Sequence, residues 1–161
     1  MLKGYLANGL FSLGDRLVNE MIAKAVRHTL PNVDLYVPQE NDAINDKTAF
    51  ANSEQIAYAD IEALKMSDFL IAVIDGVEID SGVAAEIGAF SMLNRPIFAV
   101  FTDSRQQGRD NMKKIEALRA DAVENQFVYR NLFVVGLIKQ NGCVCTTIDE
   151  LTVELKKQFM S

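Results

Sequence analysis

The chain has 161 residues and a mass of 17.9 kDa, and its 16 Lys and Arg residues against 22 Asp and Glu residues give a net charge of −6. This length favours a single domain over residues 1–161, large enough to fold without disulfides or metal ions. The acidic balance disfavours a protein that binds nucleic acid polymers. The sequence has no apolar run of about 18 residues, so we expect no membrane span, and without a signal-peptide pattern at its start we expect a cytoplasmic protein.

The first part of the chain predicts a strand, a helix and a second strand. An apolar run over 2–7 predicts the first strand, and Ser12 or Asp15 is the expected N-cap of a helix that reaches about His28. Residues 33–37 predict a second short strand, which a proline ends.

A polar stretch over 39–47 predicts a loop, and a helix over about 48–66 is expected to follow it. Apolar residues at helical spacing define the expected inner side of that helix: Ile56, Ala59, Ala63 and Leu64.

The middle of the chain predicts two buried parallel strands with a helix between them. The apolar runs are 69–74 and 96–101, and both are bounded by turn residues. Asp80 or Ser81 is the expected N-cap of the intervening helix, which we expect to reach Asn94.

The last third of the chain predicts a helix over 110–122 and a last helix that begins at a capping box formed by Thr147 and Glu150. The apolar run over 131–140 fits either a helix or a strand, and we favour a helix. Cys143 and Cys145 lie two residues apart, and we interpret both as buried thiols. With one histidine in the chain, a Cys/His metal site is not expected, so any acid–base chemistry must come from carboxylates.

Strands that alternate with helices predict an α/β fold. We expect a three-layer, flavodoxin/Rossmann-like architecture with a mostly parallel five-stranded sheet and helices on both faces. In such sheets ligands bind beyond the carboxyl ends of the strands. Residues 8–11, 75–81 and 102–105 follow predicted strands, so they are the expected binding loops.

Glu86 is the most informative acidic residue. On a helical wheel it lies beside the apolar line formed by Val83, Ile87 and Phe90, one or two turns into its helix, where the helix dipole favours a negative charge. A partly desolvated carboxylate that stays ionised suits a nucleophile. The alternative is an acidic residue that only stabilises the start of the helix.

Other candidates also have structural alternatives. Asp60 lies on the inner side of its helix, an unusual place for an aspartate. Asp80 is a candidate proton donor or a simple N-cap, and Asp75 and Asp103 end strands, where they could cap loops. Tyr5 alternates within the first strand and is a candidate site residue or a core residue.

Five segments together resemble the nucleoside 2-deoxyribosyltransferase family, in the family's order and over most of residues 3–105. The most specific is the Asp-Ser-Gly-x-x-x-Glu-Ile-Gly element over 80–88, joined to the strand before it. The others are 5–12, 59–68, 72–76 and Arg95-Pro-Ile.

The resemblance implies an enzyme of nucleoside salvage that moves 2-deoxyribose between nucleobases, without cofactor or metal, through a covalent glycosyl-enzyme. It implies Glu86 as nucleophile, Tyr5 as the residue that orients it, and Asp60 and Asp80 as acids that contact the base and manage its proton. Asn131 matches an asparagine lent by a neighbouring subunit to the sugar's 5′-hydroxyl. With the strand-end loops, the expected substrate-binding residues are Asn8, Gly9, Phe11, Asp75, Gly76, Ser81 and Asn131.

The implied partners are deoxynucleosides, free nucleobases and further copies of the chain, in a dimer-based oligomer, tetramer or hexamer. Two other functions compete with transfer. A deoxynucleoside 5′-monophosphate N-glycosidase would use the same Glu and pass the sugar to water, and Arg105 and Arg109 are the cations that favour it. A non-catalytic nucleotide-binding module is the second alternative, because a fold does not fix a function.

Overall fold

The computed structural model describes residues 1–41, 51–121, 123 and 126–160. At its centre lies a sheet of five parallel strands in the order β2-β1-β3-β4-β5. This is the flavodoxin-like order, which confirms the expected fold class. The strands are β1 (Lys3–Ala7), β2 (Asp34–Tyr36), β3 (Phe69–Val73), β4 (Ile97–Val100) and β5 (Gly142–Cys145).

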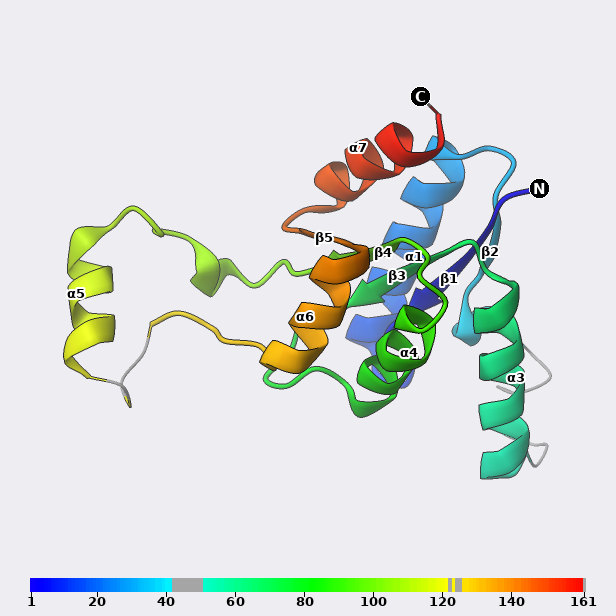
Figure 1. Ribbon diagram of the computed structural model, residues 1–161, viewed down its shortest axis with the longest axis horizontal. Helices are drawn as coiled ribbons and strands as arrows, with labels where there is room; N and C mark the ends of the chain where they lie inside the picture. The colour runs from blue at the N-terminus through cyan, green and yellow to red at the C-terminus, as the bar shows by residue number, and fades with distance from the viewer. Residues whose placement is uncertain (42–50, 122, 124–125, 161) are drawn as a thin grey trace.

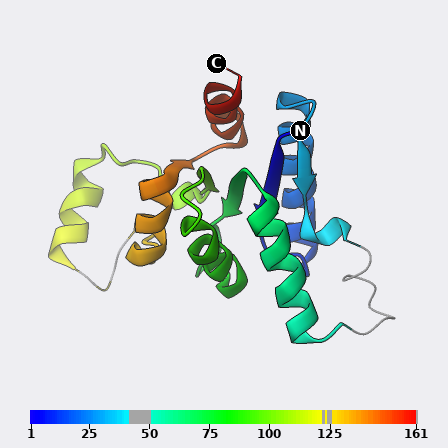
Figure 2. The same cartoon turned by 45° about the vertical axis from the view of Figure 1, so that its right-hand side comes forward.

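Helices cover both faces of this sheet (Figures 1 and 2). One face carries α1 (Leu13–Thr29) and α7 (Ile148–Phe159), and the other carries α3 (Ser53–Met66), α4 (Ser81–Ser91) and α6 (Leu132–Asn141). Two short 3₁₀ turns, η1 (Pro38–Glu40) and η2 (Ser104–Gln106), follow β2 and β4. Within the described part of the chain, no helix is long and apolar enough to cross a membrane.

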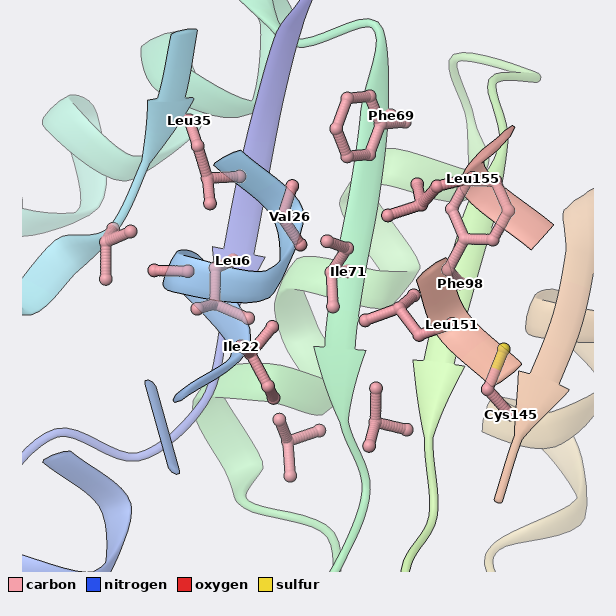
Figure 3. Close-up of a cluster of buried hydrophobic side chains, with 14 of the residues drawn as sticks. Leu6, Ile22, Val26, Leu35, Phe69, Ile71, Phe98, Cys145, Leu151 and Leu155 are labelled. Carbon is pink, nitrogen blue, oxygen red and sulfur yellow. The ribbon is translucent and has the colours of Figure 1, made fainter. Parts of the chain in front are cut away.

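Alternation along the strands divides the core into two clusters. In β3, Phe69 and Ile71 pack toward α1 and α7, whereas Leu70 and Ala72 pack toward the other face. Figure 3 shows the first cluster, in which Leu6 and Ile71 of the sheet meet Ile22 of α1 and Leu151 of α7. All five residues of β3 are buried, as expected for a parallel strand covered on both faces.

The edge strand β5 is the element that the sequence did not place. Gly142 begins it, and a Cβ atom there would overlap the carbonyl oxygen of Ile97 on β4. Glycine therefore permits the close approach of the two strands at this point. Cys143 and Cys145 point the same way, with their Sγ atoms 3.9 Å apart. Cys145 is buried and Cys143 is partly buried.

Several predicted boundaries and faces need correction. The helix expected over 48–66 begins at Ser53 with Asn52 as N-cap, and 48–50 lie outside the described residues. Of its expected inner side only Leu64 is fully buried: Ile56 is exposed at the edge of a cavity, and Ala59 and Ala63 are partly buried. The next helix, α4, ends at Ser91, before Asn94 adopts a positive φ.

Of the last three predicted helices, the one over 131–140 is α6, and the other two differ from expectation. The helix expected over 110–122 is α5 (Met112–Ala120), and residue 122 lies outside the described residues. This helix has no buried residue and lies apart from the sheet in Figures 1 and 2. The expected capping box of α7 forms only in part. Thr147 accepts from the Glu150 backbone, but the Glu150 carboxylate binds the backbone N–H of Thr146.

Candidate active site

A short hydrogen bond links the first strand to the fourth helix at the candidate site. The Tyr5 hydroxyl donates to Glu86 Oε1 over 2.5 Å. Tyr5 lies on β1 among the buried residues of the sheet, and α4 presents Glu86 beside the buried side chains of Val83 and Ile87. The helical wheel therefore placed Glu86 correctly, at the edge of the apolar face.

The electrostatics of Glu86 differ from the expectation of a fully ionised carboxylate. Burial raises the pKa of Glu86 to about 7, and the negative charges of Asp60 and Asp80 act in the same direction. The hydrogen bond from Tyr5 lowers the pKa, because it stabilises the ionised form. At neutral pH the group is thus divided between its two forms, and carboxyl groups with pKa values shifted in this way are common at functional sites.

Asp60 is the second carboxylate of the site. It is partly buried on α3; burial raises its pKa, and the nearby hydroxyls of Tyr5 and Tyr36, which favour the ionised form, lower it. Tyr36 on β2 is directly in register with Tyr5 on β1, and the two rings lie 5.1 Å apart between centroids. The register of two adjacent strands thus places the two tyrosine rings side by side on one face of the sheet.

Asp80 performs the capping role that the sequence offered as an alternative. One carboxylate oxygen accepts from the backbone N–H groups of Gly82 (2.8 Å) and Val83 (3.1 Å). Asp80 is exposed and close enough to Glu86 for its charge to raise the pKa of Glu86. Ser81 is the first residue of α4 and is exposed.

A cavity of about 380 Å³ opens between α3 and α4, and both Asp60 and Glu86 line it. The remaining lining is mostly small or apolar: Ser53, Ile56, Ala57, Ile61, Leu64, Gly82, Ala85 and Ala89. An apolar cavity with a few convergent polar groups is typical of a small-molecule site. None of the seven residues expected to bind substrate is among these lining residues.

The loop after β1 is held by a residue that the sequence analysis did not single out. Asn19 of α1 is 3% exposed, and it accepts from Asn8 Nδ2 and donates to the carbonyl of Gly9 and to Gln39 Oε1. Asn8 and Gly9 are therefore fixed in place rather than mobile. Phe11, in the same loop, is 79% exposed.

The first residues of the loop after β3 are held by two sets of hydrogen bonds. The Asp75 carboxylate accepts from the backbone N–H and the hydroxyl of Thr102, which joins the ends of β3 and β4. Gly76 adopts a φ of 99°, which favours glycine. Arg130 donates to the carbonyls of Gly76 (2.6 Å) and Val77 (3.0 Å). Asp75 thus has the loop-capping role, and Arg130 is a further residue missed from sequence.

Asn131 is the N-cap of α6, where its side-chain oxygen accepts from the N–H groups of Phe133 and Val134. Its side chain is exposed, next to Arg130. The neighbouring Leu132 and Phe133 are 84% and 74% exposed. Among the described residues, no group of three or more His, Cys, Asp or Glu side chains is arranged to hold a metal ion.

A family model described as nucleoside 2-deoxyribosyltransferase matches residues 5–159. The crystal structure of a conserved protein from Enterococcus faecalis V583 is 48% identical to this chain over 99% of both chains, with a TM-score of 0.92. No curated protein sequence matches the chain.

Two more distant structures share the fold. A 2-deoxyribosyltransferase from Bacillus psychrosaccharolyticus is 18% identical over 93% of this chain and 90% of that chain, with a TM-score of 0.64. The CMP N-glycosidase BcmB from Clostridium botulinum is also 18% identical, over 98% of this chain and 99% of that chain, with a TM-score of 0.50.

Proposed function

The chain belongs to the nucleoside 2-deoxyribosyltransferase family, and we propose that it transfers 2-deoxyribose from one nucleobase to another through a covalent deoxyribosyl-Glu86 intermediate. The observation that carries this proposal is the Tyr5–Glu86 hydrogen bond beside Asp60, at a cavity between α3 and α4. A carboxylate oriented by a phenol and partly removed from water has the properties of a nucleophile.

In the first half-reaction, a Glu86 oxygen forms a bond to C1′ of the sugar while the bond from C1′ to the base nitrogen breaks. The transition state resembles an oxocarbenium ion, and the negative charge of Glu86 stabilises it. Asp60 or Asp80 supplies a proton to the departing base, which leaves neutral. General acid help of this kind is typically worth about 10²–10⁴-fold in rate.

The second half-reaction runs the same steps in reverse with a different base. The incoming base nitrogen attacks C1′, the ester bond to Glu86 breaks, and the aspartate takes back the proton of the base. Two displacements at one carbon retain its configuration. The Tyr5 hydroxyl holds Glu86 in line in both halves.

The charge around the cavity favours a nucleoside over a nucleoside 5′-monophosphate. Asp60 and Glu86 line the cavity, Asp80 lies within electrostatic range of Glu86, and no lysine or arginine is among the described lining residues. Of the two cations that supported the hydrolase alternative, Arg105 is paired with Asp103 at 2.6 Å. Arg109 lines other cavities. A phosphate in the α3–α4 cavity would therefore face net negative charge.

A second copy of the chain is the protein partner that we propose. Leu132 and Phe133 are exposed apolar residues directly after Asn131. Buried against another copy, they would bring Asn131 toward a neighbouring site, where its amide nitrogen could donate to the sugar's 5′-hydroxyl. The proposed substrates remain deoxynucleosides and free nucleobases, either purine or pyrimidine.

A base-exchange assay tests the proposal. The protein is mixed with deoxyadenosine and free cytosine or hypoxanthine, and products are separated by chromatography. We expect the new deoxynucleoside to appear, and to be lost in Glu86→Ala but retained in Glu116→Ala, an exposed glutamate of α5. Free deoxyribose without a new deoxynucleoside would instead support the hydrolase, and the monophosphate is the substrate to try next. Binding without any turnover would support the nucleotide-binding module.

A further inference from the structure

We propose that the chain has a second ligand site, which takes an aromatic phosphate ester such as a nucleoside 5′-monophosphate. The site is a cavity of about 420 Å³ lined by residues of α5, α6 and the segment after β4. No described residue lines both this cavity and the α3–α4 cavity that holds Asp60 and Glu86. The inference goes beyond the proposed reaction and does not depend on it, because it concerns binding at a different place in the fold.

The cavity gathers positive charge in a chain whose net charge is −6. Arg109, Arg130 and Lys139 line it, and no aspartate or glutamate is among its described lining residues. Arg109 and Lys139 are exposed, and neither forms an ion pair with an acid in the described part of the chain. Both side chains can therefore turn toward a bound anion, with which a guanidinium or an ammonium group forms charge-assisted hydrogen bonds.

Arg130 adds a buried cation whose charge is only partly compensated. Its side chain is 5% exposed, and its Nε atom is buried without a hydrogen-bond partner among the described residues. The carboxylate beside it belongs to Asp103, which lies 3.8 Å away and is already paired with Arg105 at 2.6 Å. One carboxylate thus faces two guanidinium groups. The excess positive charge in a partly desolvated setting favours an anion in the cavity.

Glu150 is the acid that approaches this region, and it is held by other contacts. It lies within electrostatic range of Arg109, whose charge lowers the pKa of Glu150. Its carboxylate accepts from the backbone N–H of Thr146 over 2.6 Å and from the hydroxyl of Thr146 over 3.0 Å. Glu150 is not among the residues that line the cavity, so it leaves the cations there accessible to a ligand.

Aromatic side chains give the same cavity a surface for a flat ring. Phe101, Phe127 and Tyr129 line it, and most of the remaining lining is aliphatic. Tyr129 is 65% exposed, and the guanidinium of Arg130 lies 4.9 Å from the centroid of the Phe101 ring. Every nucleobase has a face that stacks on an aromatic side chain. The lining therefore suits a base, and the three cations suit the phosphate attached to it.

Charge separates the ligands of the two cavities. Asp60 and Glu86 line the α3–α4 cavity, which disfavours a phosphate, whereas the second cavity is lined by cations. A nucleoside without a phosphate lacks the group that these cations bind, so it has little affinity for the second site. With no carboxylate among its described lining residues, the second site has no counterpart of the Glu86 nucleophile. It is therefore a site for binding and not for sugar transfer.

Calorimetric titration of deoxyadenosine 5′-monophosphate into the Glu86→Gln protein tests this inference, because that substitution prevents turnover of the ligand. We expect Kd to rise about tenfold or more when Arg109→Gln and Lys139→Gln are added together, since two charge-assisted contacts are lost. The matched control adds Lys113→Gln and Arg119→Gln, which remove two exposed cations of α5 that do not line the cavity. Kd in the control should stay within about twofold of that of Glu86→Gln alone.

Two competitors identify where the monophosphate binds and what is recognised. Deoxyadenosine in tenfold excess should not displace it, because the nucleoside lacks the phosphate and is expected in the α3–α4 cavity. Inorganic phosphate should compete only weakly, because it has no base to stack. Arg130 is left unchanged in these variants, since its hydrogen bonds to the carbonyls of Gly76 and Val77 make its loss destabilising.

Three results overturn the inference. The first is no binding of the monophosphate at millimolar concentration, and the second is the same Kd in the Arg109→Gln and Lys139→Gln protein as in the control. The third is displacement by deoxyadenosine, which would place the monophosphate in the α3–α4 cavity. Inorganic phosphate that binds as tightly as the monophosphate would overturn the role given to the aromatic lining. Failure of the base-exchange assay leaves this test unaffected, because the titration measures binding alone.

Discussion

The hydroxyl of Tyr5 lies 2.5 Å from Oε1 of Glu86, although 81 positions separate the two residues in the chain. The parallel pairing of β1 with β3 and the packing of α4 on that face bring them together. The short bond has a chemical consequence. It opposes the effect of burial on Glu86, so that a carboxylate in an apolar setting can still ionise near neutral pH.

Removing this hydrogen bond should slow the reaction and shift its pH dependence. In Tyr5→Phe the group that lowers the pKa of Glu86 is gone, so that pKa rises above about 7. The nucleophile must be ionised, so the acidic limb of the kcat/KM profile should move to higher pH. We expect kcat at pH 7 to fall about 10–100-fold. A profile that superimposes on that of the unmodified protein would contradict this role.

The raised pKa of Glu86 also predicts how stability depends on pH. The folded-state pKa of about 7 lies above the ordinary value of 4.5, so the native state holds a proton that the unfolded chain releases. Stability from this group is complete below pH 4.5 and is lost as pH rises to about 7. Glu86→Gln removes the ionisable group and should be more stable than the unmodified protein at pH 8, by on the order of 2–3 kcal/mol.

Urea unfolding at pH 5 and pH 8 measures this difference. The stabilising effect of Glu86→Gln should shrink toward pH 5, while Glu116→Gln on the exposed helix α5 should show no such trend. A Glu86→Gln variant that gains nothing between the two pH values would mean that Glu86 ionises without cost in the folded protein.

The position of Glu86 could be predicted because it depends on local periodicity. Val83, Ile87 and Phe90 define a buried face within one helix, and a wheel places Glu86 beside it. The ring contact between Tyr5 and Tyr36 could not be found in this way. It depends on the register between β1 and β2, which is not written in the residues around either tyrosine.

Arg130 also could not be identified from local periodicity in the sequence, and it gives a further prediction. Its side chain is 5% exposed and donates hydrogen bonds to two carbonyls of the loop after β3. Its Nη2 atom also lies 3.8 Å from Oδ2 of Asp103. Arg130→Met leaves these acceptors without their partner, so we expect a loss of about 2–4 kcal/mol in unfolding free energy. Arg119→Met, at an exposed position of α5, should cost less than about 0.5 kcal/mol. Equal stabilities of the two variants in urea would contradict the role of Arg130.

The buried network around Asn19 predicts a link between stability and substrate affinity. Asn19→Ala removes three hydrogen bonds that fix Asn8, Gly9 and Gln39. We expect a destabilisation of about 1–3 kcal/mol, because buried polar groups lose their partners. If the loop after β1 binds substrate, KM should rise more than kcat falls. Glu20→Ala, the exposed neighbour, serves as control. An unchanged KM in Asn19→Ala would remove Asn8 and Gly9 from the proposed binding residues.

The fold was predictable where apolar runs are long and less so where they are short. All five residues of β3 are buried, and its sequence shows this directly. The edge strand β5 has four residues and begins with a glycine. It is a strand because Gly142 lets it pair closely with β4, which is a tertiary contact. The inner side of α3 was misjudged at Ile56, which lines a cavity instead of the core.

The covalent intermediate is the central claim, and trapping it is the most direct test. The protein is incubated with a deoxynucleoside and no acceptor base, quenched in acid, and digested for mass spectrometry. We expect a deoxyribosyl group on the peptide that contains Glu86, absent from Glu86→Gln and lost from the unmodified protein when an acceptor base is added. Base exchange that proceeds with no such adduct at any time point, or with the sugar attached to another residue, would contradict it.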